Sequence, residues 1–91
     1  MDQIFYIDLM EVHNKDELQE LLEDELPLPD YYGRNLDAFN DVLTECGSEW
    51  NIIFYNSKFA EYRLGKYFDA FKRLCAEACE EVKGLRIRFY P

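Results

Sequence analysis

The chain has 91 residues, which is enough for one domain with a modest hydrophobic core and too short for two. Hydrophobic residues make up 48% of the sequence and charged residues 32%, so a packed globular domain is expected rather than disorder. The net charge of −9 argues against direct nucleic-acid binding, because phosphate contacts need cations. No apolar run approaches the roughly 18 residues of a membrane span, so no membrane partner is expected.

The charge is unevenly distributed along the chain. Residues 1–49 contain 14 acidic and two basic residues, a net charge of −12, whereas residues 50–91 contain eight basic and five acidic residues. Solubility alone would explain the sign of the charge but not this asymmetry. An anionic surface from the first half is suited to steering a cationic protein into contact.

The first residues and the cysteines favour the cytoplasm. Met1–Gln3 lacks the basic and apolar regions of a secretory signal, and three cysteines are an odd number for a disulfide framework. Cys75 and Cys79 lie one helical turn apart, but a metal would need two more ligands and the single His13 is far away in sequence. We therefore interpret both cysteines as small apolar fillers and expect no cofactor.

The first two predicted elements are a strand and a helix. The apolar run Ile4–Ile7, followed by Leu9, is typical of a strand buried on both faces. Asn14 and Glu17 resemble a capping box at the start of the helix, and Pro27 ends it. The buried face of this helix is predicted to consist of Leu18, Leu21, Leu22 and Leu26.

The stretch Leu28–Leu43, with the sequence LPDYYGRNLDAFNDVL, passes through a turn into a helix that we place from about Asn35 to Glu45. Gly33 suits a left-handed or tight-turn backbone, and Asn35 is a good N-cap. The helix has an apolar face at Leu36, Phe39 and Leu43, and its end is expected near Cys46 and Gly47. Its other face carries Asp37, Asp41 and Thr44, with Asn40 beside them.

This acidic stripe has two interpretations. The simpler one is a solvated outer face. However, like charges at positions i and i+4 cost a few tenths of a kcal/mol, and Asp is a mediocre helix former. Asp37 gains from the helix dipole in the first turn, but Asp41 lies too far along the helix to gain much. The alternative is that the stripe is kept for a partner.

The rest of the chain alternates between strands and helices. Trp50–Tyr55 is predicted to be a strand with a fully buried centre at Ile52–Phe54. Phe59–Leu64 is predicted to be a short helix broken at Gly65. The longest helix is expected from Lys66 to about Val82, with an apolar stripe at Phe68, Phe71, Cys75, Ala78 and Val82. Leu85–Tyr90 alternates as a last strand, with Arg86 and Arg88 facing outward. Strands separated by helices indicate an α/β fold with a parallel sheet.

The run from Leu28 to Ala38, continued by Asp41, Leu43 and Thr44, resembles the signature of the barstar family. These proteins are small intracellular bacterial inhibitors of secreted guanyl-type ribonucleases. The match is dense over this stretch and weak elsewhere, although the order of elements also fits. The resemblance implies a barstar-like α/β fold, in which a three-stranded parallel sheet packs against about four helices.

The resemblance also implies how the protein would act. Asp41 would replace an RNA phosphate in the cationic site of a basic extracellular-type ribonuclease, with Asp37 as a second anion. Tyr31 would supply an aromatic contact and Thr44 a hydrogen bond at the rim. Further partner-binding positions would be Gly33, Asn35, Asn40 and Glu77. For Tyr32 we favour a structural role at the helix entry. The inhibitor is expected to be a monomer.

The sequence departs from the family at two positions on or near the binding helix. Asn40 stands where members carry a Trp, and Cys46 stands where an aromatic residue is often found. Arg34 also adds a positive charge beside the anionic stripe. The cognate enzyme is therefore expected to differ in shape from a standard family enzyme.

Two other classes of function remain open. A small acidic adaptor would bind another basic protein through the same face. An enzyme is disfavoured, because the single His13 has no evident acid–base partner and is expected in a loop, and because no GxSxG motif or phosphate-binding glycine loop is present. Asp37 and Asp41 could form a carboxylate pair, but general acid catalysis is not expected from an exposed helix face without a cleft.

Overall fold

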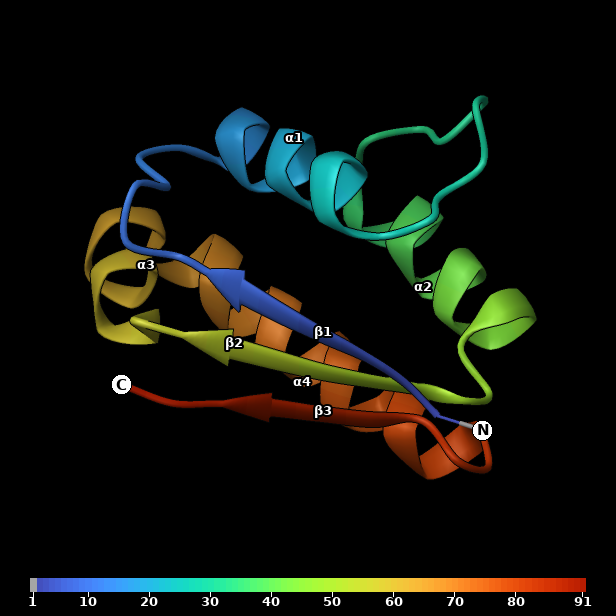
Figure 1. Ribbon diagram of the computed structural model, residues 1–91. Coiled ribbons are helices and arrows are strands. Elements are labelled where there is room, and N and C mark those ends of the chain that lie inside the picture. The colour runs from blue at the N-terminus through green and yellow to red at the C-terminus, as the bar shows by residue number, and fades with distance from the viewer. Residues whose placement is uncertain (1) are drawn as a thin grey trace.

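The computed structural model describes residues 2–91, which form three strands and four helices (Figure 1). In chain order these are β1 (Gln3–Asp8), α1 (Lys15–Glu25), α2 (Leu36–Cys46), β2 (Trp50–Tyr55), α3 (Ser57–Leu64), α4 (Lys66–Glu81) and β3 (Arg86–Phe89). The strands are parallel in the order β1-β2-β3, so β2 is central. The predicted three-stranded parallel sheet with four helices is confirmed. Within residues 2–91, no helix is long and apolar enough to cross a membrane.

The sheet is covered on one face only, and this corrects the prediction for β1. In Figure 1 the helices lie behind the strands or beyond the β1 edge, and the front of the sheet is open. Ile4 and Tyr6 of β1 point to this open face and are 54% and 64% exposed. The expectation of a strand buried on both faces was wrong because the helices cover only one face of the sheet (Figure 1), and for the same reason Ile53 of the central strand β2 is only partly buried. Arg86 and Arg88 are exposed, as predicted.

The inner face of the sheet meets the helices in an aromatic cluster centred on Phe71 of α4. Its ring stacks on Phe39 of α2 with centroids 5.5 Å apart and meets Phe54 of β2 edge-on at the same distance. Phe68 and Phe89 complete the cluster at centroid distances of 5.8 and 6.1 Å. The predicted stripe of α4 is buried at its first four positions, and Val82 is half-buried beyond the helix end.

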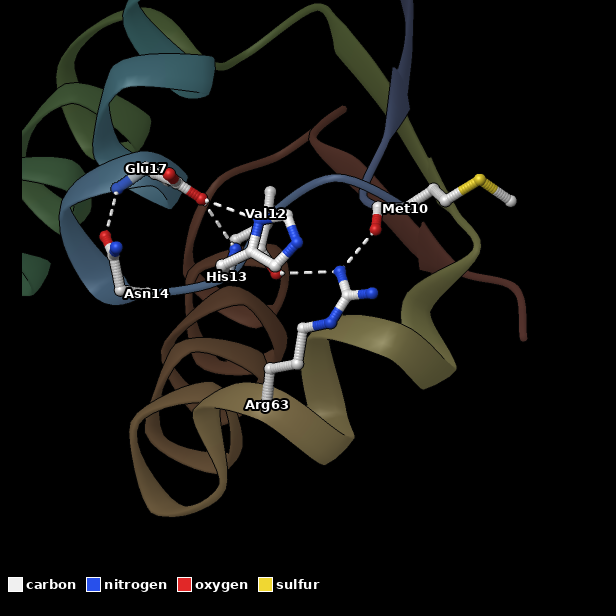
Figure 2. A network of polar contacts seen from close by, with 6 residues as sticks. All are labelled: Met10, Val12, His13, Asn14, Glu17 and Arg63. Atoms are coloured by element: carbon white, nitrogen blue, oxygen red, sulfur yellow. Dashed lines mark hydrogen bonds and ion pairs between the residues drawn. The ribbon is translucent and has the colours of Figure 1, made fainter.

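The connection between β1 and α1 is ordered by polar contacts (Figure 2). Asn14 caps α1 as predicted, because its Oδ1 accepts a 2.9 Å bond from the Glu17 amide. Glu17 Oε1 accepts a 2.8 Å bond from the His13 amide and lies 3.1 Å from His13 Nδ1. The backbone bond from His13, followed by its side-chain bond, lowers the pKa of Glu17. His13 lies in a loop as expected, but it does have an acidic partner.

Helix α3 begins at Ser57, two residues earlier than predicted, and only Gly65 separates it from α4. Asn56 precedes α3 in a left-handed conformation with φ of 57°, and its Nδ2 donates to Asp8 at the end of β1. This long-range bond joins the start of α3 to the end of β1, and local periodicity in the sequence gives no signal for it. Arg63 also ties α3 to the β1–α1 connection. Its Nη1 donates to the carbonyl oxygens of Met10 and Val12.

We predict that Phe71→Ala lowers the free energy of unfolding by about 3–5 kcal/mol, because it leaves a cavity where two helices and two strands meet. Phe59→Ala is the matched control, because its ring is half-exposed and lies outside the core cluster, and should cost about 1 kcal/mol. Urea denaturation of the two variants checks this. Equal losses of unfolding free energy in the two variants would contradict the prediction that Phe71 is the centre of the aromatic core cluster.

Candidate partner-binding site

The site is built on α2, whose two sides differ sharply. Phe39, Val42 and Leu43 are buried against the core. Asp37, Asp41 and Thr44 are exposed on the other side, and Asn40 is half-buried. Because α-helical side chains three and four positions apart share a face, burial of the apolar stripe turns the acidic stripe outward.

The helix start has the predicted cap. Asn35 has extended dihedral angles, and its Oδ1 accepts a 2.7 Å bond from the Ala38 amide. At the other end, the Gly47 amide donates to the Leu43 carbonyl. The Thr44 hydroxyl donates a 2.9 Å bond to the Asp41 carbonyl, so its proton is already used within the helix. The Thr44 oxygen can still accept a bond from a partner.

The first hollow lies between α2 and the preceding loop and has a volume of about 250 Å³. Its polar wall includes Tyr31, Gly33, Asp41 and Glu45. Tyr31 is 85% exposed, so its ring is free to contact a partner beside Asp41. Glu45 was not among the residues predicted from the sequence. Its position one turn after Asp41 was the available signal.

The second hollow lies between α2 and α4 and has a volume of about 320 Å³. Its polar lining consists of Asp37, Asn40, Arg73, Glu77 and Glu81. The structure thus places Glu77 of α4 in one groove with Asp37 and Asn40 of α2. Arg73 and Glu81 were not selected from sequence. Each is four residues from Glu77, but only the packing of α2 on α4 brings them to the site.

The turn before α2 differs from the expectation for Gly33. The left-handed residue is Arg34, with φ of 54°. At Gly33 the constraint is one of space, because a Cβ there would lie 3.3 Å from the Ala38 Cβ, a tight contact. Arg34 Nε donates a 2.6 Å bond to Glu23 Oε1 of α1, so its charge is paired away from α2. This ion pair compensates in part for the left-handed backbone.

A buried hydrogen-bond network joins the loop before α2 to α1 and α4. The Tyr32 hydroxyl donates to Gln19 Oε1 of α1, and Gln19 Nε2 donates to the Tyr67 hydroxyl of α4 at 2.9 Å. Gln19 is 2% exposed and Tyr32 is 7% exposed. The structural role predicted for Tyr32 is confirmed. Desolvation on burial raises the pKa of Tyr32 well above its usual range.

The cysteines lie apart from α2's acidic side, except for the exposed Cys46 at its end. Cys75 is buried in the core, and burial raises the pKa of its thiol. Cys79 is half-buried, and burial raises its pKa as well. Throughout residues 2–91, no group of three or more His, Cys, Asp or Glu side chains could hold a metal ion.

An α/β fold with a three-stranded parallel sheet, presenting an acidic helix entered through a Tyr-Tyr-Gly loop, defines the class of barstar-like proteins. The comparison with known proteins agrees with it: the family model described as "Barstar (barnase inhibitor)" matches residues 2–90. The chain belongs to the barstar family. It is 40% identical over 78 residues to a protein of Bacillus subtilis (strain 168) named "Putative ribonuclease inhibitor YrdF". That alignment covers 85% of this chain and 86% of the relative.

We predict that the Tyr32 hydroxyl contributes a loss of stability as the pH rises above about 10. Because the pKa of Tyr32 is higher in the folded protein than in the unfolded chain, the unfolded chain releases the Tyr32 proton at a lower pH. This release favours unfolding by about 1.4 kcal/mol at pH 11. The contribution is fully present below pH 10. Urea titrations from pH 8 to 11 should show a smaller loss for Tyr32→Phe than for the parent protein.

Tyr62→Phe is the control for this experiment, because Tyr62 is 90% exposed. It should keep the alkaline loss of the parent protein. The same loss in Tyr32→Phe as in Tyr62→Phe would contradict the proposed role of the buried hydroxyl.

Proposed function

We propose that this protein inhibits a secreted guanyl-type, barnase-like ribonuclease by covering its active site with α2 and the preceding loop. The family description and the relative's name support ribonuclease inhibition in general. The observation that carries the more specific proposal is the pair of hollows that flank an exposed row of carboxylates on α2.

Asp41 is the residue that we assign to the phosphate site of the enzyme. Such a ribonuclease holds the RNA phosphate with a cluster of Arg, Lys and His side chains, and a carboxylate placed there meets the same charges. Within residues 2–91, the Asp41 carboxylate has no hydrogen bond or ion pair. It therefore breaks no internal contact when it binds a partner.

The flanking groups extend this contact on both sides. Tyr31 and Gly33 shape the surface on the loop side, and Asp37 and Glu77 offer carboxylates to a further cation on the α4 side. Asn35, Asn40 and Thr44 supply shape and hydrogen bonds around this centre. Since α2 and α4 are rigid elements, little ordering cost would accompany binding.

In this proposal the protein is a cytoplasmic monomer that binds a protein rather than nucleic acid and catalyses no reaction itself. The alternative is an acidic adaptor for another basic protein through the same face. Asn40 and Cys46, which leave the binding helix without its usual aromatic residues, favour a partner of different shape in either case.

We predict that Asp41→Ala raises the inhibition constant for a barnase-type ribonuclease at least about 30-fold, mainly through faster dissociation, because it leaves desolvated cations unpaired on the enzyme. Titration of RNA cleavage by the purified ribonuclease measures this constant. Glu20→Ala is the control, because it removes one exposed acid of α1 away from both flanking hollows. Equal weakening by the two variants would contradict an inserted Asp41.

We predict a different effect for the acids of α1. The double variant Glu20→Gln, Asp24→Asn should slow association and flatten its salt dependence while leaving dissociation nearly unchanged, because long-range attraction acts on the encounter. Stopped-flow association at several salt concentrations tests this. A change confined to the dissociation rate would instead place α1 in the direct contact.

A further inference from the structure

The groove between α2 and α4 contains one cation among carboxylates. Arg73 lies on its wall together with Asp37, Glu77 and Glu81. A uniformly anionic groove would accept any basic side chain. The presence of an arginine makes the groove electrostatically mixed, so it distinguishes between partners by where their charges lie.

Arg73 is also available for a partner. Within the described part of the chain its guanidinium has no hydrogen bond or ion pair, although Glu77 follows one helical turn later. Two other cations are used internally: Arg34 of the loop before α2 pairs with Glu23, and Lys72 Nζ lies 3.9 Å from Glu61. Arg73 is exposed, so its free donors face solvent in the groove.

We propose that Arg73 is a specificity-determining residue, and that the groove recognises a basic side chain of the ribonuclease with an acidic side chain next to it. This inference rests on the proposed inhibitory function and names the chemistry of the partner surface at that site. Asp37 and Glu77 bind the partner's cation, and Arg73 donates to the neighbouring carboxylate through its planar fork of donors.

The selectivity follows from repulsion as well as attraction. A partner that presents only cations here places one of them beside Arg73, and like charges brought together at an interface weaken binding. A partner with a carboxylate at this point satisfies both signs of charge. Asn40, half-buried in the same groove, adds an amide whose oxygen can accept from the basic side chain and whose NH2 group can donate to the carboxylate.

A simpler role for Arg73 would be to relieve repulsion among the acids of the groove. That role affects every partner equally, since it acts within the free protein. Selectivity between partners is therefore the measurement that separates the two roles.

The test compares inhibition constants for a panel of purified secreted guanyl-type ribonucleases that differ in acidic residues around their active sites. The inhibitors are the parent protein, Arg73→Gln, Arg73→Glu and the control Lys72→Gln, which removes the same charge one residue away and outside the groove. We expect Arg73→Gln to weaken the tightest complex about ten-fold and the weakest much less. Arg73→Glu should tighten binding to the enzymes with the fewest acidic residues, and Lys72→Gln should change all constants by one small factor.

The inference would be overturned if each Arg73 variant changed the inhibition constants of all enzymes by the same factor. It would also be overturned if Lys72→Gln had the same effect on these constants as Arg73→Gln. Either result would leave the inhibitory function intact. Failure of the parent protein to inhibit any enzyme of the panel would overturn both. Unchanged urea midpoints of the Arg73 variants verify that the constants report binding rather than folding.

Discussion

The position of the proposed binding surface depends on the contact between Phe39 of α2 and Phe71 of α4. The two rings stack with centroids 5.5 Å apart, and Phe71 also meets the sheet at Phe54. Burying Phe39 sets the rotation of α2, and helical geometry then turns Asp37 and Asp41 to the outside. The same contact places α4 beside α2, so that Glu77 and Arg73 share a groove with Asp37. A core interaction thus decides which charges a partner meets.

The loop before α2 is held by polar contacts instead. The network through Tyr32, Gln19 and Tyr67 joins the loop to α1 and α4, and its burial makes each of its hydrogen bonds costly to lose. On the surface, Arg34 pairs with Glu23. Anchoring one tyrosine leaves its neighbour Tyr31 exposed at the edge of the acidic side. Such fixed geometry limits the entropy lost when a surface binds.

In the proposed function, the charge distribution adds a second level of recognition. The acids of the first half attract a cationic protein from a distance, but salt screens this attraction and it distinguishes poorly among basic partners. Short-range contacts at the interface must then discriminate among basic partners. A row of carboxylates on α2, interrupted across the groove by an unpaired arginine on α4, combines attraction with local discrimination.

The sequence by itself determined the elements whose signals are local. The caps at Asn14 and Asn35, the apolar stripe of α4 and the central strand β2 follow from side-chain chemistry and periodicity over a few residues. The stretch around α2 was sufficient to indicate the barstar family. Only the tertiary structure decided that Ile4 and Tyr6 face solvent, because the covering of only one sheet face is a property of the whole assembly (Figure 1). It likewise decided that Arg34 rather than Gly33 takes the left-handed backbone, and that Arg73 lies beside Asp37, because pairings between residues far apart in the chain arise from packing and leave no periodic signal.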